Sequence, residues 1–232
     1  MTDPNIQIGI LLFPNVTQLD ATGPAQVLSR VPGAKVHMIW KTKEPIPTDA
    51  GFSILPTTTF ADCPKLDVIC VPGGAGQAAL MTDEETLGFL RRQAATARYV
   101  TSVCTGSLVL AAAGLLKGYK AGCHWAWREM LKPFGAEPVA ERVVRDRNRI
   151  TGGGVTAGID FGFVVASELA GEEAAKMIQL FLEYDPKAPF DCGSPEKAGE
   201  ARVAKAREMM ARLLAERQKT TAAAAAALAA RQ

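Results

Sequence analysis

The sequence predicts an α/β fold with a mostly parallel central sheet and helices on both of its faces. Predicted strands alternate with predicted helices along most of the chain, which is typical of a parallel sheet. Several strands are almost continuously apolar, as in IQIGILLF at 6–13 and LDVICV at 66–71, so both faces of these strands are expected to be buried. In such sheets the ligand site lies beyond the carboxyl ends of the strands, and the loops there are the first place to search for function.

The first half of the chain supplies strands and helices in the expected alternation. After strand 6–13, the loop PNVTQLDATG leads to a helix that is expected to begin at Pro24, since proline suits the first helical position. Asp83 is placed to cap a second helix, which is expected to end near Ala97. Further strands are predicted at 34–41 and 66–71, with 53–60 as an edge strand or hairpin.

The stretch YVTSVCTGSLVLAAAGLL at 99–116 is the centre of the predicted fold. A β-branched run predicts a buried strand, and the pattern changes to helix directly after Cys104. The turn at 102–106, SVCTG, has the pattern of a nucleophile elbow with cysteine as the nucleophile. The sulfur would then lie at a helix N-terminus, which favours the thiolate, and Thr105 either lends a hydroxyl to the site or starts the helix. The alternative is that Cys104 is a small buried residue of the core.

The second half continues the alternation and then departs from it. Helices are predicted at 124–134, 156–169 and 172–184, a hairpin from 138–144 and 148–151, and a glycine-rich turn at 152–154. After a segment rich in proline and glycine, a terminal amphipathic helix has an apolar side made by Val203, Met209, Met210, Leu213 and Leu214. Its alanine-rich end is expected to fray. We therefore expect an α/β domain over 1–190, with 191–232 as a C-terminal helical extension of the same domain.

Composition argues against several classes of partner. The chain has 232 residues and a formal charge of +2, with acids and bases mixed, so neither nucleic acid nor an anionic membrane is expected. No apolar run reaches the ~20 residues that span a bilayer, and the polar N-terminus has no signal-peptide pattern. The five cysteines form no C-x-x-C pair. This usage argues against a disulfide framework or a metal site and favours a reducing, cytoplasmic compartment.

Two segments, 74–79 and 152–157, match the G-x-G-x-x-A pattern of a dinucleotide-binding turn. A Rossmann site also needs an acidic residue about 20 residues later, and the sequence AATARYV after the first segment contains none. We therefore expect no nicotinamide or flavin cofactor. Gly73 and Gly74 fit another use, in which a backbone N–H acts with that of Thr105 to stabilise charge developing near the cysteine.

A cysteine nucleophile needs a proton partner, and Asp20 is the strongest candidate. It follows the first strand in QLDATGP, where a carboxylate stands among apolar neighbours. The alternative is an Asx-turn or a cap for the helix at Pro24. His37 lies within a predicted strand and is expected to be structural. His124 lies near the strand ends, where it either approaches the site or packs between two tryptophans.

Five segments together resemble the ThiJ/PfpI superfamily, which is related to the class I glutamine amidotransferases: QLDATGPAQVL, LDVICVPGGAG, YVTSVCTGSLVLAAAGLL, HWAW and TGGGVTAGIDF. The similarity runs from Ile6 to Tyr184, and within the superfamily the chain looks most like the bacterial isocyanide hydratases. Most members have glutamate at the position of Asp20, and many have histidine at that of Thr105; both departures are features of these hydratases. They also occur in sensor domains of some arabinose-operon-activator-type regulators, but the residues after Tyr184 are too few for the helix-turn-helix pair of those regulators.

The resemblance implies a flavodoxin-like fold of ThiJ/PfpI type, a homodimer, no metal, and hydration of an isocyanide to an N-substituted formamide. In this chemistry the Cys104 thiolate adds to the terminal isocyanide carbon, and water releases the formamide from a thioimidate. Asp20 delivers and recovers the protons, while the N–H groups of Gly74 and Thr105 stabilise charge. Further residues expected to line the site are Gly73, His124 and Val155.

Two other functions stay open at this point. One is a different cysteine-dependent enzyme of the same fold, glyoxalase-like or peptidase-like, against which the combination of Asp20 and Thr105 counts. The other is a non-enzymatic sensor or redox module, in which Cys104 is oxidised to a sulfenic or sulfinic acid. Isocyanide hydration itself contains no redox step, so the favoured function requires no cofactor.

Overall fold

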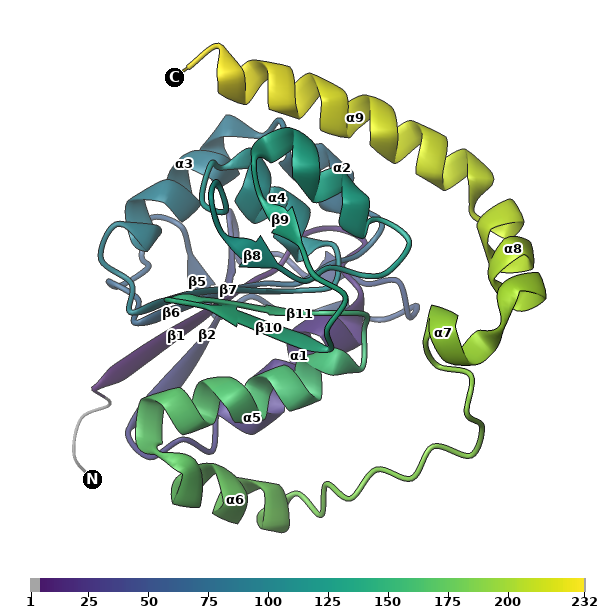
Figure 1. The fold of residues 1–232 in the computed structure, drawn as a ribbon. Helices are drawn as coiled ribbons and strands as arrows, with labels where there is room; N and C mark the ends of the chain where they lie inside the picture. The colour runs from purple at the N-terminus through teal and green to yellow at the C-terminus, as the bar shows by residue number, and fades with distance from the viewer. Residues whose placement is uncertain (1–4, 232) are drawn as a thin grey trace.

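A computed structural model describes residues 5–231, and within them the central sheet has seven strands in the order β10-β11-β7-β6-β1-β2-β5 (Figure 1). The strands are β1 (Ile6–Leu11), β2 (Ala34–Trp40), β5 (Thr58–Thr59), β6 (Val68–Val71), β7 (Tyr99–Val103), β10 (Val143–Asp146) and β11 (Arg149–Gly152). All neighbouring pairs are parallel except β10 and β11, which form the predicted hairpin. The prediction of a mostly parallel central sheet is therefore confirmed.

Helices cover both faces of this sheet, as predicted (Figure 1). The helices of the α/β body are α1 (Gln18–Leu28), α2 (Gln77–Leu80), α3 (Glu84–Ala94), α4 (Gly106–Ala112), α5 (Ala157–Ala170) and α6 (Glu172–Phe181), with a 3-10 helix, η1 (Arg128–Phe134). One face carries α1, α5 and α6, and the other carries α2, α3 and α4. Two short strand pairs lie outside the sheet: β3 (Ile46–Pro47) with β4 (Ser53–Ile54), and β8 (Lys120–Ala121) with β9 (Glu137–Pro138).

The apolar runs become the central strands because both of their faces are covered. Every residue of β6 and of β11 is buried. The register sets Val71 of β6 beside Ser102 of β7, and Val103 beside Gly152 of β11. The three strands therefore end at nearly the same level, and the loops that follow them meet at one edge of the sheet.

Helix α1 begins at Gln18 rather than at Pro24, so the predicted start is wrong by six residues. Contacts with distant parts of the chain fix the earlier start. Val16 forms isolated β-bridges with Thr48 and Gly74, and the Thr17 N–H donates to the Gly73 carbonyl over 2.9 Å. Pro24 lies within the helix, where its ring lacks the N–H that would bond one turn back.

The C-terminal segment forms three helices instead of one. They are α7 (Pro195–Ala198), α8 (Glu200–Met209) and α9 (Ala211–Ala229), and the chain turns at Met210 between the last two. As Figure 1 shows, α9 crosses the outer side of α4. Its alanine-rich part is helical to Ala229, with Thr221 and Ala224 buried, so the expected fraying is wrong: small side chains let this helix pack closely.

The apolar stripe predicted for this segment is only partly buried. Met210 and Leu214 pack against the core, whereas Met209 is 79% exposed and Leu213 is 37% exposed. The turn at Met210 explains the difference, because it ends the single helical face that the periodicity assumed.

Candidate active site

The nucleophile elbow forms where β7 ends and α4 begins. Cys104 has a φ of 57°, in the left-handed region that costs a residue with a side chain roughly 1–2 kcal/mol. Its N–H donates to the carbonyls of Gly152 (3.1 Å) and Gly153 (2.8 Å), which hold the turn against the end of β11. Gly106 is required because a side chain there would overlap the Val71 carbonyl. The small residues of the motif are thus explained by close backbone packing.

Asp20 reaches the elbow from the first turn of α1 and is completely buried. Its Oδ2 accepts the Gly73 N–H over 2.8 Å, and its Oδ1 has no hydrogen-bond partner among the described residues. Burial raises the pKa of this carboxyl to about 7, against the opposing effects of the Gly73 N–H and the Cys104 thiol. A cap for a helix at Pro24 does not fit this geometry, because the helix starts before Asp20 and its carboxyl faces Gly73 and Cys104.

Gly73 and Gly74 each donate a backbone N–H to a residue of the predicted site, Asp20 and Thr105 respectively. A side chain on Gly73 would come within 2.6 Å of the Thr105 nitrogen and 2.8 Å of Asp20 Oδ2, so only glycine fits. The Gly74 N–H donates to Thr105 Oγ1 over 3.2 Å, whereas the Thr105 N–H faces the Cys104 sulfur. The Thr105 half of the expected charge-stabilising pair therefore points at the Cys104 sulfur. The Gly74 half is bonded to a hydroxyl, and its role stays a prediction.

The Cys104 thiol differs from the sequence-based expectation of a favoured thiolate. Burial raises its pKa well above the usual value, and the nearby Asp20 and Cys123 raise it further, while the Thr105 N–H lowers it. The helix N-terminus alone does not overcome this desolvation. Because Asp20 also has a raised pKa, the two groups are suited to share a single proton. Moving that proton from sulfur to carboxylate creates the thiolate without changing the net charge of the pocket.

The two histidines lie in different environments. His37 lies on β2, and its ring nitrogens are within hydrogen-bonding distance of Thr58 Oγ1 on β5 (2.9 Å) and Gln7 Oε1 on β1 (2.7 Å), as expected for a structural residue. His124 precedes η1 instead of starting a helix, and burial together with Arg217 lowers its pKa to about 4. It is therefore neutral at pH 7.

A cavity of about 230 Å³ opens onto the sulfur. It is lined by the predicted residues Cys104, Thr105, Gly74, His124 and Val155, and also by Thr17, Ala75, Trp127, Leu213 and Arg217. The sequence reasoning missed the last five. For Leu213 and Arg217 the available signal was their i, i+4 spacing on a helix, which places them on one side.

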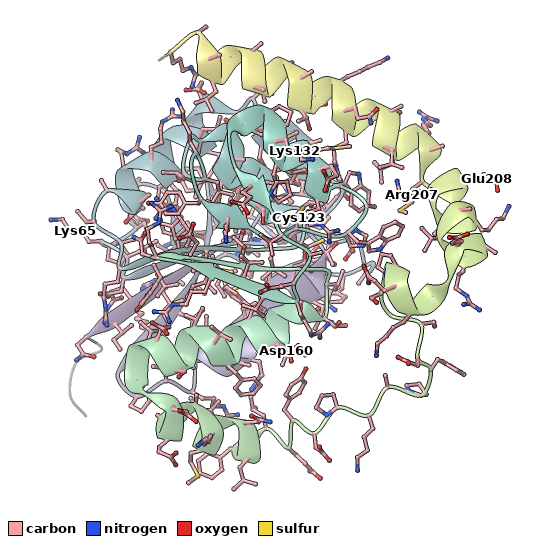
Figure 2. All side chains as sticks on the ribbon, in the orientation of Figure 1. Lys65, Cys123, Lys132, Asp160, Arg207 and Glu208 are labelled. Carbon is pink, nitrogen blue, oxygen red and sulfur yellow. The ribbon has the colours of Figure 1, made fainter. Side chains whose placement is uncertain are left out.

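Cys123 lies outside this cavity. It is buried, and Figure 2 labels it near the centre of the view, whereas Glu208 extends outward from α8. Burial raises the pKa of the Cys123 thiol to about 12.

Among residues 5–231 no group of three or more His, Cys, Asp and Glu side chains is arranged to hold a metal ion. No helix in the same range is long and apolar enough to cross a membrane.

Comparison with known proteins identifies the family to which the chain belongs. The isonitrile hydratase of Pseudomonas putida is 57% identical over 96% of this chain and 98% of its own length. The crystal structure of a ThiJ/PfpI family protein from Pseudomonas syringae has a TM-score of 0.88 and 48% identity, covering 97% of this chain and 91% of that one. The transcriptional regulator GbdR of Pseudomonas aeruginosa is 31% identical over 77% of this chain but only 50% of its own length. The model of the DJ-1/PfpI family matches residues 6–168, and the chain belongs to this family.

Proposed function

We propose that this protein is an isocyanide hydratase, which adds water to an isocyanide and releases an N-substituted formamide. The observation that carries the proposal is the pairing of Cys104 with a buried carboxyl, Asp20, whose pKa of about 7 lets it take up or release a proton at neutral pH. Nearly full-length similarity to an isonitrile hydratase supports the same reaction. No electron is transferred, and the chemistry needs only a nucleophile, an acid–base group and water.

The first half of the reaction forms a thioimidate. Asp20 accepts the thiol proton, and the Cys104 thiolate attacks the terminal carbon of R–N≡C. The new C–S bond leaves an electron pair on that carbon, which Asp20 protonates to give R–N=CH–S–Cys. The Thr105 N–H faces the sulfur and stabilises its charge before the attack.

The second half consumes water and restores the enzyme. The Asp20 carboxylate takes a proton from a water molecule while the water oxygen attacks the thioimidate carbon. Asp20 then passes this proton to the substrate nitrogen. The tetrahedral carbon then expels the sulfur, forms the formamide C=O and returns its hydroxyl proton to the Cys104–Asp20 pair. Each group finishes as it started. A positioned acid–base residue of this kind contributes about 10²–10⁴ to the rate.

The test is turnover of a simple alkyl isocyanide, with the N-alkyl formamide detected by proton NMR. The wild-type protein should form product continuously, and Cys104→Ser should not, because its less acidic hydroxyl lacks a sufficient base in this pocket. The melting temperature of the serine variant provides the control for folding. If wild-type protein forms no formamide from several alkyl and aryl isocyanides, the proposal fails.

Nearly full-length similarity to an isonitrile hydratase favours this enzyme over a redox sensor. Similarity to GbdR extends over half of that regulator, and in this chain α9 supplies Leu213 and Arg217 to the cavity.

We further propose that the protein is a cytoplasmic homodimer. An apolar groove between α1 and α5 is lined in part by Val27, Ile159 and Leu182. Near it, Leu180 and Phe181 of α6 are 72% and 71% exposed. Burying these side chains against a second copy is favourable by the hydrophobic effect. The five free cysteines suit a reducing compartment.

A further inference from the structure

Arg217 on α9 is an arginine buried at the candidate active site. Its side chain is 3% exposed and lines the Cys104 cavity together with Leu213, one turn earlier on the same helix. One guanidinium nitrogen, Nη2, donates to the Gly74 carbonyl over 3.1 Å. The guanidinium also lies over the Trp127 ring, 4.6 Å from its centroid. These contacts fix a positive charge beside the elbow.

This charge has no carboxylate partner in the described part of the chain, although 15 ion pairs occur there. The Nε atom of Arg217 is also buried without a hydrogen bond. A buried guanidinium stays protonated, and burying it without an anion is costly. The cost is offset if an anion appears beside it during the reaction.

The groups that face Cys104 identify that anion. They are Asp20 from α1, Cys123 and His124 from the segment before η1, and Arg217 from α9. His124 is neutral, and Cys123 is buried outside the cavity with a pKa of about 12. Asp20 is the proton acceptor that makes a thiolate accessible to Cys104. Burial lowers the pKa of Arg217, and the Cys104 and Cys123 sulfurs both oppose that effect. Of these two sulfurs only Cys104 lines the same cavity as Arg217, so the anionic Cys104 sulfur is the natural partner for the Arg217 charge.

We propose that Arg217 is a positioning residue that stabilises the Cys104 thiolate through its charge and holds the Gly74 peptide next to Thr105. The N–H of Gly74 donates to the Thr105 hydroxyl. Arg217 therefore acts on both the Cys104 sulfur and Thr105, the residue that follows Cys104 in the sequence. This inference rests on the proposed function for its effect on turnover, but its effect on the thiolate is independent of the substrate.

The experiment measures the rate of Cys104 alkylation by iodoacetamide across a pH series, with peptide mass mapping to separate Cys104 from the exposed Cys192. Arg217→Gln and Arg217→Met both remove the charge, and the methionine keeps an unbranched stem against Trp127. At a fixed pH below the Cys104 pKa, each should alkylate about tenfold more slowly, as expected if loss of the charge raises the thiol pKa by about one unit. Arg217→Lys should restore the rate to within about twofold.

The matched control is Arg212→Gln, which removes a charge from the same helix at an exposed site paired with Glu216. It should alkylate like the wild type, and melting temperatures should show that each variant is folded. Having two charge-removing variants keeps the test decisive if one of them misfolds. Equal alkylation rates in all folded variants would overturn the proposal, and so would a lysine variant as slow as glutamine.

Turnover gives a separate readout. If the wild type hydrates isocyanides, the charge-removing variants should lose about tenfold in kcat, with lysine retaining most of it. A rise in KM with unchanged alkylation would assign Arg217 to substrate binding and overturn its role in stabilising the thiolate. A wild type without turnover refutes the proposed function alone, since the alkylation series still decides the role of Arg217.

Discussion

Replacing Asp20 by asparagine separates its two consequences, one for chemistry and one for stability. The amide has the same shape, and its oxygen still accepts the Gly73 N–H that Asp20 accepts over 2.8 Å. It cannot carry a proton between sulfur, carbon and water. Formamide production should therefore fall by about 10²-fold or more, with the fold intact.

The effect on stability follows from the raised pKa. An unfolded aspartate titrates at 3.8, whereas the folded carboxyl titrates at about 7. Between these values the folded state binds more protons, so its stability falls as the pH rises from about 4 to 7. The difference of about 3 pKa units corresponds to about 4 kcal/mol. The neutral amide avoids this cost, so its advantage over the wild type should grow by up to that amount above pH 7.

The assay is thermal unfolding of both proteins at pH 5 and pH 8, together with formamide formation. Between pH 5 and the folded pKa of about 7, about 2 of these pKa units develop, which corresponds to about 2.7 kcal/mol. For a chain of this size that corresponds to roughly 5–11 °C, so the gap in melting temperature should widen by about 8 °C in favour of the variant. Asp62→Asn, at an exposed carboxylate 3.8 Å from Lys43 Nζ, is the control and should show no such widening. A gap that is independent of pH would refute the raised pKa. Near-wild-type formamide formation would remove Asp20 from the mechanism.

Three further predictions follow from the same geometry. The rate of isocyanide hydration should rise through about pH 7, because below the Asp20 pKa both groups of the pair are protonated and no base accepts the thiol proton; a flat profile between pH 5.5 and 8 would contradict this. Gly73→Ala should lose most turnover and about 1–3 kcal/mol of stability, measured by urea unfolding, because its methyl group would meet the Thr105 nitrogen and Asp20 Oδ2. Deleting residues from Glu200 onward should lower stability, as expected if 191–232 extends the same domain. The deletion should also reduce turnover, because it removes Leu213 and Arg217 from the cavity. A truncated protein with full activity would show that α9 has no role in the site.

The elbow could be predicted because its determinants are local. A β-branched strand, a small turn and an apolar helix occur within eighteen consecutive residues, so the motif is visible in one short segment of the sequence. The apolar runs of β1 and β6 likewise record burial on both faces. The start of α1 was not readable, since it depends on bonds from Thr17 to Gly73 and from Val16 to Thr48.

The sequence did not predict that α9 covers the cavity, and the physical reason is different. The sequence around Arg217 is charged and alanine-rich, which is typical of an exposed helix. Its burial depends on where α9 crosses α4 and η1, and the helical period alone does not specify that crossing. The thiol pKa was also misjudged, because the favourable helix N-terminus is a local feature whereas desolvation reflects all the surrounding elements.

The placement of α9 has a consequence for how the pocket matures during synthesis. Cys104 leaves the ribosome about 110 residues before Arg217, and chain growth of about 5–20 residues per second separates them by roughly 6–23 s. The sheet, the elbow and Asp20 all precede α9, so they are available to assemble while the cavity still lacks one wall. A nascent chain therefore passes through a stage in which the Cys104 thiol is uncovered. Docking of α9 both encloses the sulfur and delivers the positive charge beside it.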